Sequence, residues 1–185
     1  SSIITTSHST TNSLPITPYL DQICHALSEG NVVLQAEPGA GKSTALPLSL
    51  LDAGFLQGRK IVMLEPRRIA AKSIAHYLAK QLGESVGQRI GYQIKNDRKI
   101  SQSTQLEIVT EGILTRRLQQ DPELNDTALI IFDEFHERSL HADLALMLCL
   151  EVQQSSRDDL KLLVMSATID TQLIANYIGT SQLIE

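Results

Sequence analysis

The chain of 185 residues carries 16 Lys and Arg against 21 Asp and Glu, which gives a formal net charge of −5 and an isoelectric point near 5.5. With 42% hydrophobic and 20% charged residues it has the composition of one ordinary globular domain, and two independent domains would each be unusually small. Two cysteines exclude a disulfide framework, no apolar run reaches the ~20 residues of a membrane span, and the N-terminus lacks the features of a signal peptide. We therefore expect one cytoplasmic domain, or one piece of a larger enzyme, with no membrane partner.

The charges are unevenly distributed along the chain. Residues 59–99 contain ten Lys or Arg and three acids, a net charge of +7, whereas the remainder of the chain carries −12. A basic block inside an acidic protein favours a local site for a polyanion, although a solvated helix face explains such a block equally well.

The predicted elements alternate between helices and short apolar strands. Residues 1–13 are rich in Ser and Thr and predict a disordered tail, and a helix is expected over residues 19–28. The expected strands cover residues 31–36, 60–65, 91–94, 106–110, 129–133, 160–166 and 182–184. The expected helices cover residues 42–53, 67–81, 111–119, 140–154 and 171–178. Because the strands are continuously apolar, both of their faces must be covered, and the fold class is a doubly wound, mostly parallel α/β sheet in three α/β/α layers.

A phosphate-binding loop follows the first of these strands. The segment AEPGAGKST, residues 36–44, lies between an apolar strand and a helix, which is the context that such a loop requires. Gly39, Ala40 and Gly41 supply backbone N–H groups for an anion, Lys42 can reach the terminal phosphates, and the Ser43 hydroxyl can bind Mg²⁺. The strict motif has Gly where this sequence has Ala36. The segment predicts a site for a nucleoside triphosphate.

A second acidic motif supplies what a phosphate loop needs from a neighbouring strand. Four apolar residues, 129–132, are followed directly by Asp133 and Glu134, which places both carboxylates at the carboxyl end of a strand. Asp133 is the candidate ligand of Mg²⁺ and Glu134 the candidate base that orients the attacking water. Taken alone, this pair could instead be favourable acids at a helix start.

Five motifs in this order resemble the first RecA-like domain of superfamily 2 helicases of the DEAH class. They are AEPGAGKST (36–44), LEPRRIAA (64–71), VTEGILTRRL (109–118), DEFHERS (133–139) and MSAT (165–168). The resemblance covers residues 14–185, and DEFHERS with the segments that follow it looks most like the bacterial HrpB branch. It implies a RecA-like P-loop NTPase domain that uses ATP and Mg²⁺ and binds single-stranded RNA through contacts to the RNA backbone.

The resemblance also implies roles for residues that match the motifs. Gly39, Gly41, Lys42, Ser43 and Thr44 match the phosphate and Mg²⁺ site, with Asp133, Glu134 and Lys42 as the catalytic group. The residues matching nucleic-acid contacts are Arg67, Arg68, Lys95, Asn96 and Thr110, the last beside Glu111 and Gly112. The residues matching those that couple hydrolysis to strand movement are His136, Ser166 and Thr168.

Some of these residues can also be interpreted without the family resemblance. Arg67 and Arg68 follow a strand end at a helix start, where their guanidinium groups could converge on a phosphate or could simply be solvated. Residues 95–99 have the composition of a solvated turn. Tyr77 lies where many DEAH-class enzymes carry an arginine that stacks on adenine, and it either stacks on the base or packs as part of an amphipathic helix.

The sequence leaves two other functions to be weighed. A P-loop phosphotransferase would need a lid and an acceptor site, and has no use for MSAT or LEPRR. A nucleic-acid-binding module without hydrolysis is disfavoured by the intact Lys42, Asp133 and Glu134. We expect the ATP-binding lobe of an RNA helicase, monomeric, whose second RecA-like domain belongs to the same parent chain and is absent from these residues.

Overall fold

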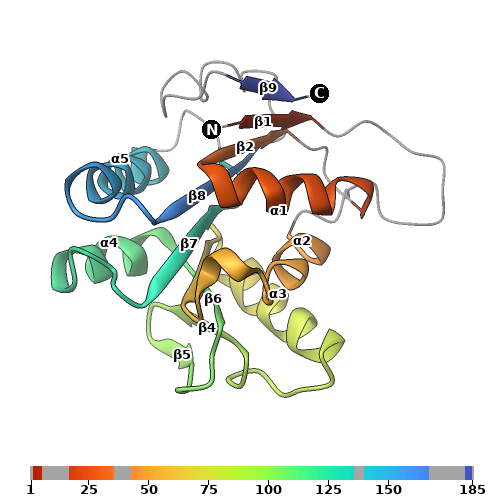
Figure 1. The fold of residues 1–185 in the computed structure, drawn as a ribbon. Coiled ribbons are helices and arrows are strands. Elements are labelled where there is room, and N and C mark those ends of the chain that lie inside the picture. Colours follow the sequence, from red (N-terminus) through yellow and green to blue (C-terminus); the bar gives the residue numbers. More distant parts are fainter. Residues whose placement is uncertain (1, 6–16, 36–42, 136–139, 167–181, 185) are drawn as a thin grey trace.

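The computed structural model describes residues 2–5, 17–35, 43–135, 140–166 and 182–184. The strands of this part of the chain form a nine-stranded sheet in the order β5-β4-β6-β3-β7-β8-β2-β1-β9 (Figure 1). Every pairing is parallel except that of β4 with β5. The strands are β1 (Ser2–Thr5), β2 (Val32–Gln35), β3 (Lys60–Leu64), β4 (Ile90–Ile94), β5 (Asp97–Lys99), β6 (Leu106–Val109), β7 (Thr127–Phe132), β8 (Lys161–Ser166) and β9 (Gln182–Ile184).

Helices cover both faces of the sheet. The helices are α1 (Leu20–Glu29), α2 (Ala45–Ser49), α3 (Arg68–Gln81), α4 (Glu111–Gln120) and α5 (Leu140–Ser155), with 3₁₀ turns at Thr17–Tyr19 and Gly54–Leu56. Side chains of α1, α2 and α3 pack in one apolar core and those of α4 and α5 in another, so the two groups lie on opposite faces (Figure 1). Of the helices described, none is both long and apolar enough to cross a membrane.

Successive side chains of one strand point to opposite faces of the sheet, and both faces are covered, so the strands are apolar throughout. In β3, Ile61 and Met63 belong to the core under α1–α3, whereas Val62 and Leu64 belong to the core under α4 and α5. Both faces are therefore buried, as expected for a parallel sheet between helical layers. The predicted three-layer, mostly parallel fold is confirmed.

Three sequence predictions differ from the structure. Part of the expected tail, Ser2–Thr5, is strand β1, which pairs with β2 and β9; its sequence SIIT is rich in β-branched residues, which suit a strand. The helix expected over 42–53 is only α2, and the chain after Ser49 continues in tight turns, with Leu50, Leu51 and Ala53 donating to carbonyls three residues back. The expected helix 171–178 lies outside the described residues.

The third difference is a hairpin where the sequence indicated only a turn. Residues 95 and 96 connect β4 to β5, with Ile94 opposite Asp97, and Asn96 adopts a left-handed φ of 65°. Asparagine tolerates this conformation better than most residues, which favours a two-residue connection here.

Gly91 allows β5 to approach β4 closely, because it has no Cβ. A Cβ at this position would clash with the Lys99 carbonyl oxygen and would lie 3.2 Å from Thr104 Cγ2. We expect Gly91→Ala to lower the free energy of unfolding by about 1–3 kcal/mol, as overpacking of a tight site does. Urea unfolding followed by circular dichroism measures it, with Gly54→Ala as the control because nothing lies within 4 Å of a Cβ there. Equal midpoints for the two variants would contradict the expectation.

Candidate nucleotide and nucleic-acid site

The carboxyl ends of the central strands bring the predicted acids to one edge of the sheet. Leu64 of β3 lies opposite both Phe132 of β7 and Val109 of β6, so the residues that follow these strands are neighbours. Asp133 follows β7 and Thr110 follows β6. On the other side of β7, Ser166 ends β8 opposite Gln35, the last residue of β2. Ligands of doubly wound sheets bind at such an edge.

Part of the predicted phosphate loop can be located. Ser43 and Thr44 form a half-buried turn directly before α2. The other phosphate-loop residues Gly39, Ala40, Gly41 and Lys42 lie outside the described residues, as do His136 and Thr168. The roles expected of these six residues stay predictions.

The acid pair after β7 has two different environments. Asp133 is 5% exposed; its N–H donates to the Leu64 carbonyl at 3.0 Å, and its Oδ1 accepts the Glu134 N–H at 3.0 Å. Glu134 has a left-handed φ of 51° and a side chain that is 43% exposed. A buried carboxylate and an accessible one, side by side, suit a metal ligand and a base that must reach water.

A third acid, Glu65, was not singled out in the sequence and lies against Asp133. It follows β3 and is 1% exposed, and its Oε1 accepts no hydrogen bond from the described residues. Burial, the hydrogen bond with Asp133 and the charges of Asp133 and Glu134 raise the pKa of Glu65 to about 9. The raised pKa favours the neutral form of this carboxyl. The sequence pattern that indicated Asp133, an acid directly after an apolar strand, also fits Glu65.

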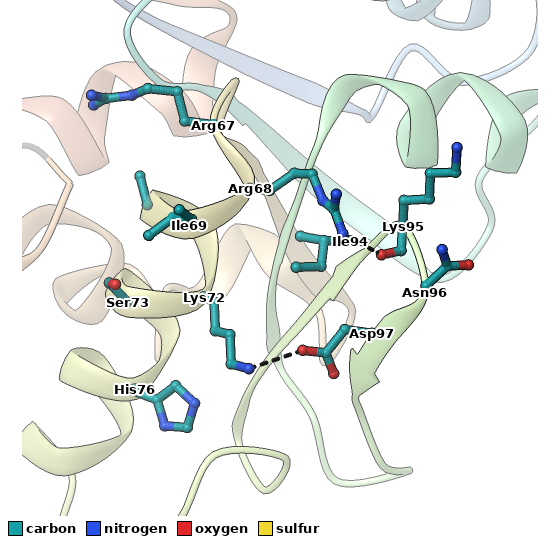
Figure 2. Close-up of a pocket in the computed structure, with 11 residues that line it drawn as sticks. Arg67, Arg68, Ile69, Lys72, Ser73, His76, Ile94, Lys95, Asn96 and Asp97 are labelled. Atoms are coloured by element: carbon teal, nitrogen blue, oxygen red, sulfur yellow. Dashed lines mark hydrogen bonds and ion pairs between the residues drawn. The ribbon is translucent and has the colours of Figure 1, made fainter.

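The two arginines at the start of α3 turn to different partners. Arg67 Nη2 lies 3.1 and 3.0 Å from the two carboxylate oxygens of Glu134, and its Nε lies 3.8 Å from Glu65 Oε1. Arg68 Nη2 donates to the Lys95 carbonyl at 2.8 Å. Figure 2 shows the two side chains extending in opposite directions from the helix start. In this structure they do not converge on one point, as the sequence had suggested they could.

A groove of about 1350 Å³ lies between α3 and the β4–β5 hairpin (Figure 2). Its lining residues come from the helix start, from the exposed side of α3 and from the hairpin turn, and include Arg67, Arg68, Lys72, Lys95, Asn96 and Asp97. Four of the ten cations of the basic block, Arg67, Arg68, Lys72 and Lys95, line this groove, so part of the block forms a concave surface and not only a solvated helix face.

Asp97 connects the β4–β5 hairpin to α3. Asp97 Oδ2 accepts the Tyr92 hydroxyl at 2.9 Å and lies 3.0 Å from Lys72 Nζ. The hydrogen bond from Lys72 is the main cause that lowers the pKa of Asp97. Together with the Arg68 bond to Lys95, these contacts hold Lys95 and Asn96 at the rim of the groove.

Three further predicted residues have defined positions but untested roles. Tyr77 is 50% exposed on α3 and is not among the groove residues, so it is accessible for stacking. Thr110 caps α4 through its carbonyl, which accepts the Ile113 and Leu114 N–H groups. Ser166 is fully buried at the end of β8.

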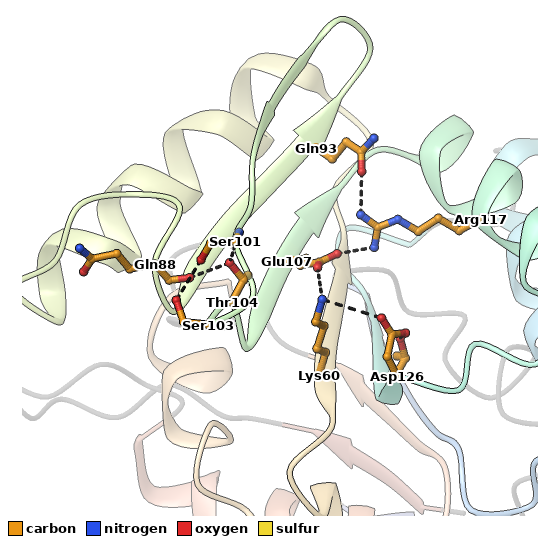
Figure 3. A network of polar contacts seen from close by, with 10 residues as sticks. Lys60, Gln88, Gln93, Ser101, Ser103, Thr104, Glu107, Arg117 and Asp126 are labelled. Atoms are coloured by element: carbon orange, nitrogen blue, oxygen red, sulfur yellow. Dashed lines mark hydrogen bonds and ion pairs between the residues drawn. The ribbon is translucent and has the colours of Figure 1, made fainter.

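A second polar cluster, near the opposite ends of the strands, has a structural explanation. Glu107, 3% exposed in β6, accepts from Lys60 at 2.9 Å and from Arg117, and Arg117 also donates to Gln93 at 2.8 Å (Figure 3). Two cations therefore satisfy this buried carboxylate, as buried charges require. Glu65 has no comparable set of donors.

Residues 17–176 match the protein family described as DEAD/DEAH box helicase. The chain belongs to this helicase family. It is 53% identical over 160 residues to the ATP-dependent RNA helicase HrpB of Escherichia coli strain K12, a match that covers 86% of the chain and 20% of that protein. It is 40% identical over 172 residues to the ATP-dependent RNA helicase HrpA of Borreliella burgdorferi, covering 92% and 21%.

Solved helicase structures agree with the fold. A crystal structure of the Escherichia coli DEAH/RHA helicase HrpB matches with a TM-score of 0.87 and 48% identity over 93% of this chain and 22% of that one. A second, of the Escherichia coli DExH-box NTPase HrpB, gives a TM-score of 0.88 and 47% identity over 96% and 22%. The predicted RecA-like domain and the resemblance to the HrpB branch are confirmed. The chain spans about a fifth of the length of these relatives.

Proposed function

We propose that this chain is the ATP-binding lobe of an ATP-dependent RNA helicase. The observation that carries the proposal is the meeting of two features at one edge of the sheet. The buried Asp133 and the accessible Glu134 lie at the carboxyl edge of the central strands, and the ion pair of Glu134 with Arg67 joins them to a basic groove. A site for phosphate chemistry next to a site for a polyanion is what a motor driven by ATP on a nucleic acid requires.

Within the proposal, ATP binds as its Mg²⁺ complex at the segment 36–44. Mg²⁺ is commonly held by one or two protein oxygens together with phosphate oxygens and water, and the Ser43 hydroxyl and the Asp133 carboxylate fit that donor set. When bound, the metal would neutralise charge on the phosphates.

The nucleic acid is proposed to lie in the groove along α3. Arg68, Lys95 and Asn96 line it, and Thr110 follows β6 at the carboxyl edge of the sheet. Contacts to phosphates do not depend on sequence and weaken with salt. The logarithm of the association constant should therefore fall linearly with the logarithm of the salt concentration. The choice of RNA over DNA rests on the names of the relatives.

We further propose that a second RecA-like domain of the same parent chain completes the catalytic site, and that the parent is a cytoplasmic monomer. In related phosphate chemistry an arginine finger contributes roughly 10³–10⁵ in rate. The 185 residues alone should therefore bind ATP weakly, hydrolyse it very slowly and not unwind a duplex. Robust RNA-stimulated hydrolysis by this chain alone would contradict this expectation.

The experiment that tests the function compares ATP turnover by the full-length parent with single-stranded RNA, with DNA of the same sequence, and with neither. Strong stimulation by RNA supports a helicase lobe. ATP-dependent transfer of phosphate to an acceptor, without stimulation by nucleic acid, would instead support a phosphotransferase. RNA binding with no turnover would support a binding module.

Tyr77 gives a separate prediction about the adenine. If its ring stacks on the base, Tyr77→Ala should weaken ATP binding by roughly 5-fold or more, because stacking on an aromatic side chain contributes about 1–3 kcal/mol. Tyr77→Phe keeps the ring and should bind ATP as the wild type does. Titration with a fluorescent ATP analogue measures both, and equal affinities for the Ala and Phe variants would assign Tyr77 to packing alone.

A further inference from the structure

Arg67 is the one residue of the predicted nucleic-acid contacts whose side chain touches a predicted catalytic residue in the described part of the chain. Its backbone caps α3 and borders the groove. Its guanidinium group leaves the groove and contacts the carboxylate of Glu134, 67 positions further along the chain. Figure 2 shows this direction, opposite to that of Arg68.

We propose that a nucleic-acid phosphate and the Glu134 carboxylate compete for the guanidinium group of Arg67, so that Arg67 restrains Glu134 until a strand enters the groove. The inference rests on the proposed function, since it needs Glu134 as the base and the groove as the site of the strand. It assigns to Arg67 a positioning role that acts through Glu134, in addition to contact with the strand.

The contact restrains Glu134 because it engages both of its oxygens. One nitrogen, Arg67 Nη2, lies 3.0 Å from Oε2 and 3.1 Å from Oε1. A general base must present an oxygen within hydrogen-bond reach of the water that it orients, with a free lone pair in the right direction. A carboxylate held by the Arg67 guanidinium is turned away from that task.

The exchange of partners is easy because the ion pair is accessible to solvent. The Arg67 side chain is 68% exposed and that of Glu134 is 43% exposed. Exposed ion pairs contribute little to stability, and a phosphate offers Arg a bidentate, charge-assisted partner. The neighbouring acid Glu65 does not replace Glu134 as a competitor, because its Oε1 lies 3.8 Å from Arg67 Nε, too far for a hydrogen bond.

Arg68 shows that adjacency alone does not create the link. It has the same position at the groove, yet its guanidinium donates to the Lys95 carbonyl on the opposite wall. That bond joins α3 to the hairpin and holds the shape of the groove. Of the two arginines, only Arg67 contacts Glu134, so only a phosphate bound by Arg67 can release that carboxylate.

Competition predicts a reciprocal effect that can be measured at equilibrium on this chain without hydrolysis. Removing the charge of Glu134 should free Arg67 for the strand, so Glu134→Gln should tighten binding of a short fluorescein-labelled oligouridylate. The expected factor is roughly two- to six-fold, the amount by which an exposed pair of ordinary strength reduces the unpaired fraction of Arg67. In an Arg67→Ala background the same change should have no effect on affinity.

The four proteins of this cycle are compared by fluorescence anisotropy at one fixed salt concentration, because affinity for a polyanion depends on salt. Tightening that requires Arg67 supports the proposal. Equal tightening with and without Arg67 would mean a general effect of charge, and no tightening would mean no competition; either result overturns it. A wild-type chain that binds no RNA would instead overturn the proposed function itself.

Turnover by the full-length parent gives a second readout. Without nucleic acid, Arg67→Ala should raise the basal kcat roughly two- to six-fold, while more RNA is needed for half-maximal stimulation. Arg67→Lys keeps a cation near Glu134 and should restore the basal rate toward the wild-type value. The matched control is Arg59→Ala, which removes another exposed ion pair just before the opposite end of β3. A basal rate that falls or stays unchanged in Arg67→Ala overturns the proposal.

Discussion

Replacing Glu134 with Gln should lower ATP turnover by the full-length parent roughly 10²–10⁴-fold, the contribution typical of a positioned general base, while ATP binding is retained. The amide has the shape of the carboxylate but cannot take a proton from water. Asp133 should still hold its place, because its Oδ1 accepts the backbone N–H of residue 134 and not the side chain. The loss should therefore appear in kcat and leave the affinity for the nucleotide largely intact.

The measurement pairs steady-state turnover in saturating RNA with equilibrium binding of a fluorescent ATP analogue. Glu151→Gln is a suitable control, because it makes the same change at an exposed position of α5. A Glu134→Gln variant that keeps more than about a tenth of wild-type turnover would remove Glu134 from the role of base. Loss of ATP binding together with turnover would show that the substitution had disturbed the whole loop.

The sequence predicted the central strands well because burial on both faces leaves a strong signal. The apolar runs at 60–65, 106–110, 129–133 and 160–166 became β3, β6, β7 and β8 with ends shifted by at most two residues. The weaker elements were missed for local reasons. The short strand β5 follows the left-handed Asn96, and α2 gives way to tight turns after Ser49. Neither produces a periodic pattern.

The site was predictable as a set of strand ends but not as a set of contacts. An abrupt change from apolar residues to acids located Asp133 and Glu134 at the carboxyl edge, and the structure agrees. The contacts of Arg67 depend on β3 lying beside β7, which local sequence does not encode. For the same reason the burial of Glu65 against Asp133 could not be anticipated, although the residue itself fitted the pattern.

Arg157 is the second position where a single substitution should have a large effect, in this case on stability. The side chain is almost fully buried and donates to the carbonyls of Glu123 at 2.9 Å, Leu124 at 2.7 Å and Thr127 at 2.8 Å, and to the Asp159 carboxylate at 2.9 Å. These bonds fix the loop between α4 and β7, where Leu124 adopts a left-handed φ of 47° that a leucine rarely takes.

Arg157→Ala removes the guanidinium donor from three carbonyls, of which that of Leu124 still accepts the Thr127 N–H, and should lower the free energy of unfolding by about 3–5 kcal/mol, the usual cost of breaking a buried charged network by removing one partner. That is a large part of the 5–15 kcal/mol available to a typical domain. Arg157→Lys restores the charge but cannot reach all the acceptors at once, so its loss should be intermediate. Urea unfolding of the chain at pH 7 measures the series, and a loss below about 1 kcal/mol for the Ala variant would contradict it.

The effect of Arg157 should also depend on pH in a stated direction. The hydrogen bond from Arg157 is the largest cause that lowers the pKa of Asp159 to about 2 from the usual 3.8. A carboxylate with a lowered pKa in the folded state adds stability above pH 3.8 and loses it as the pH falls toward 2. The gap in stability between wild type and Arg157→Ala should therefore narrow as the pH falls from about 4 toward 2. The narrowing should be partial, because the carbonyl bonds do not titrate and Arg59, 2.7 Å from Asp159, remains as a partner of this carboxylate. A gap that widens on acidification would show that the Asp159 pair is not what holds Arg157 in the loop.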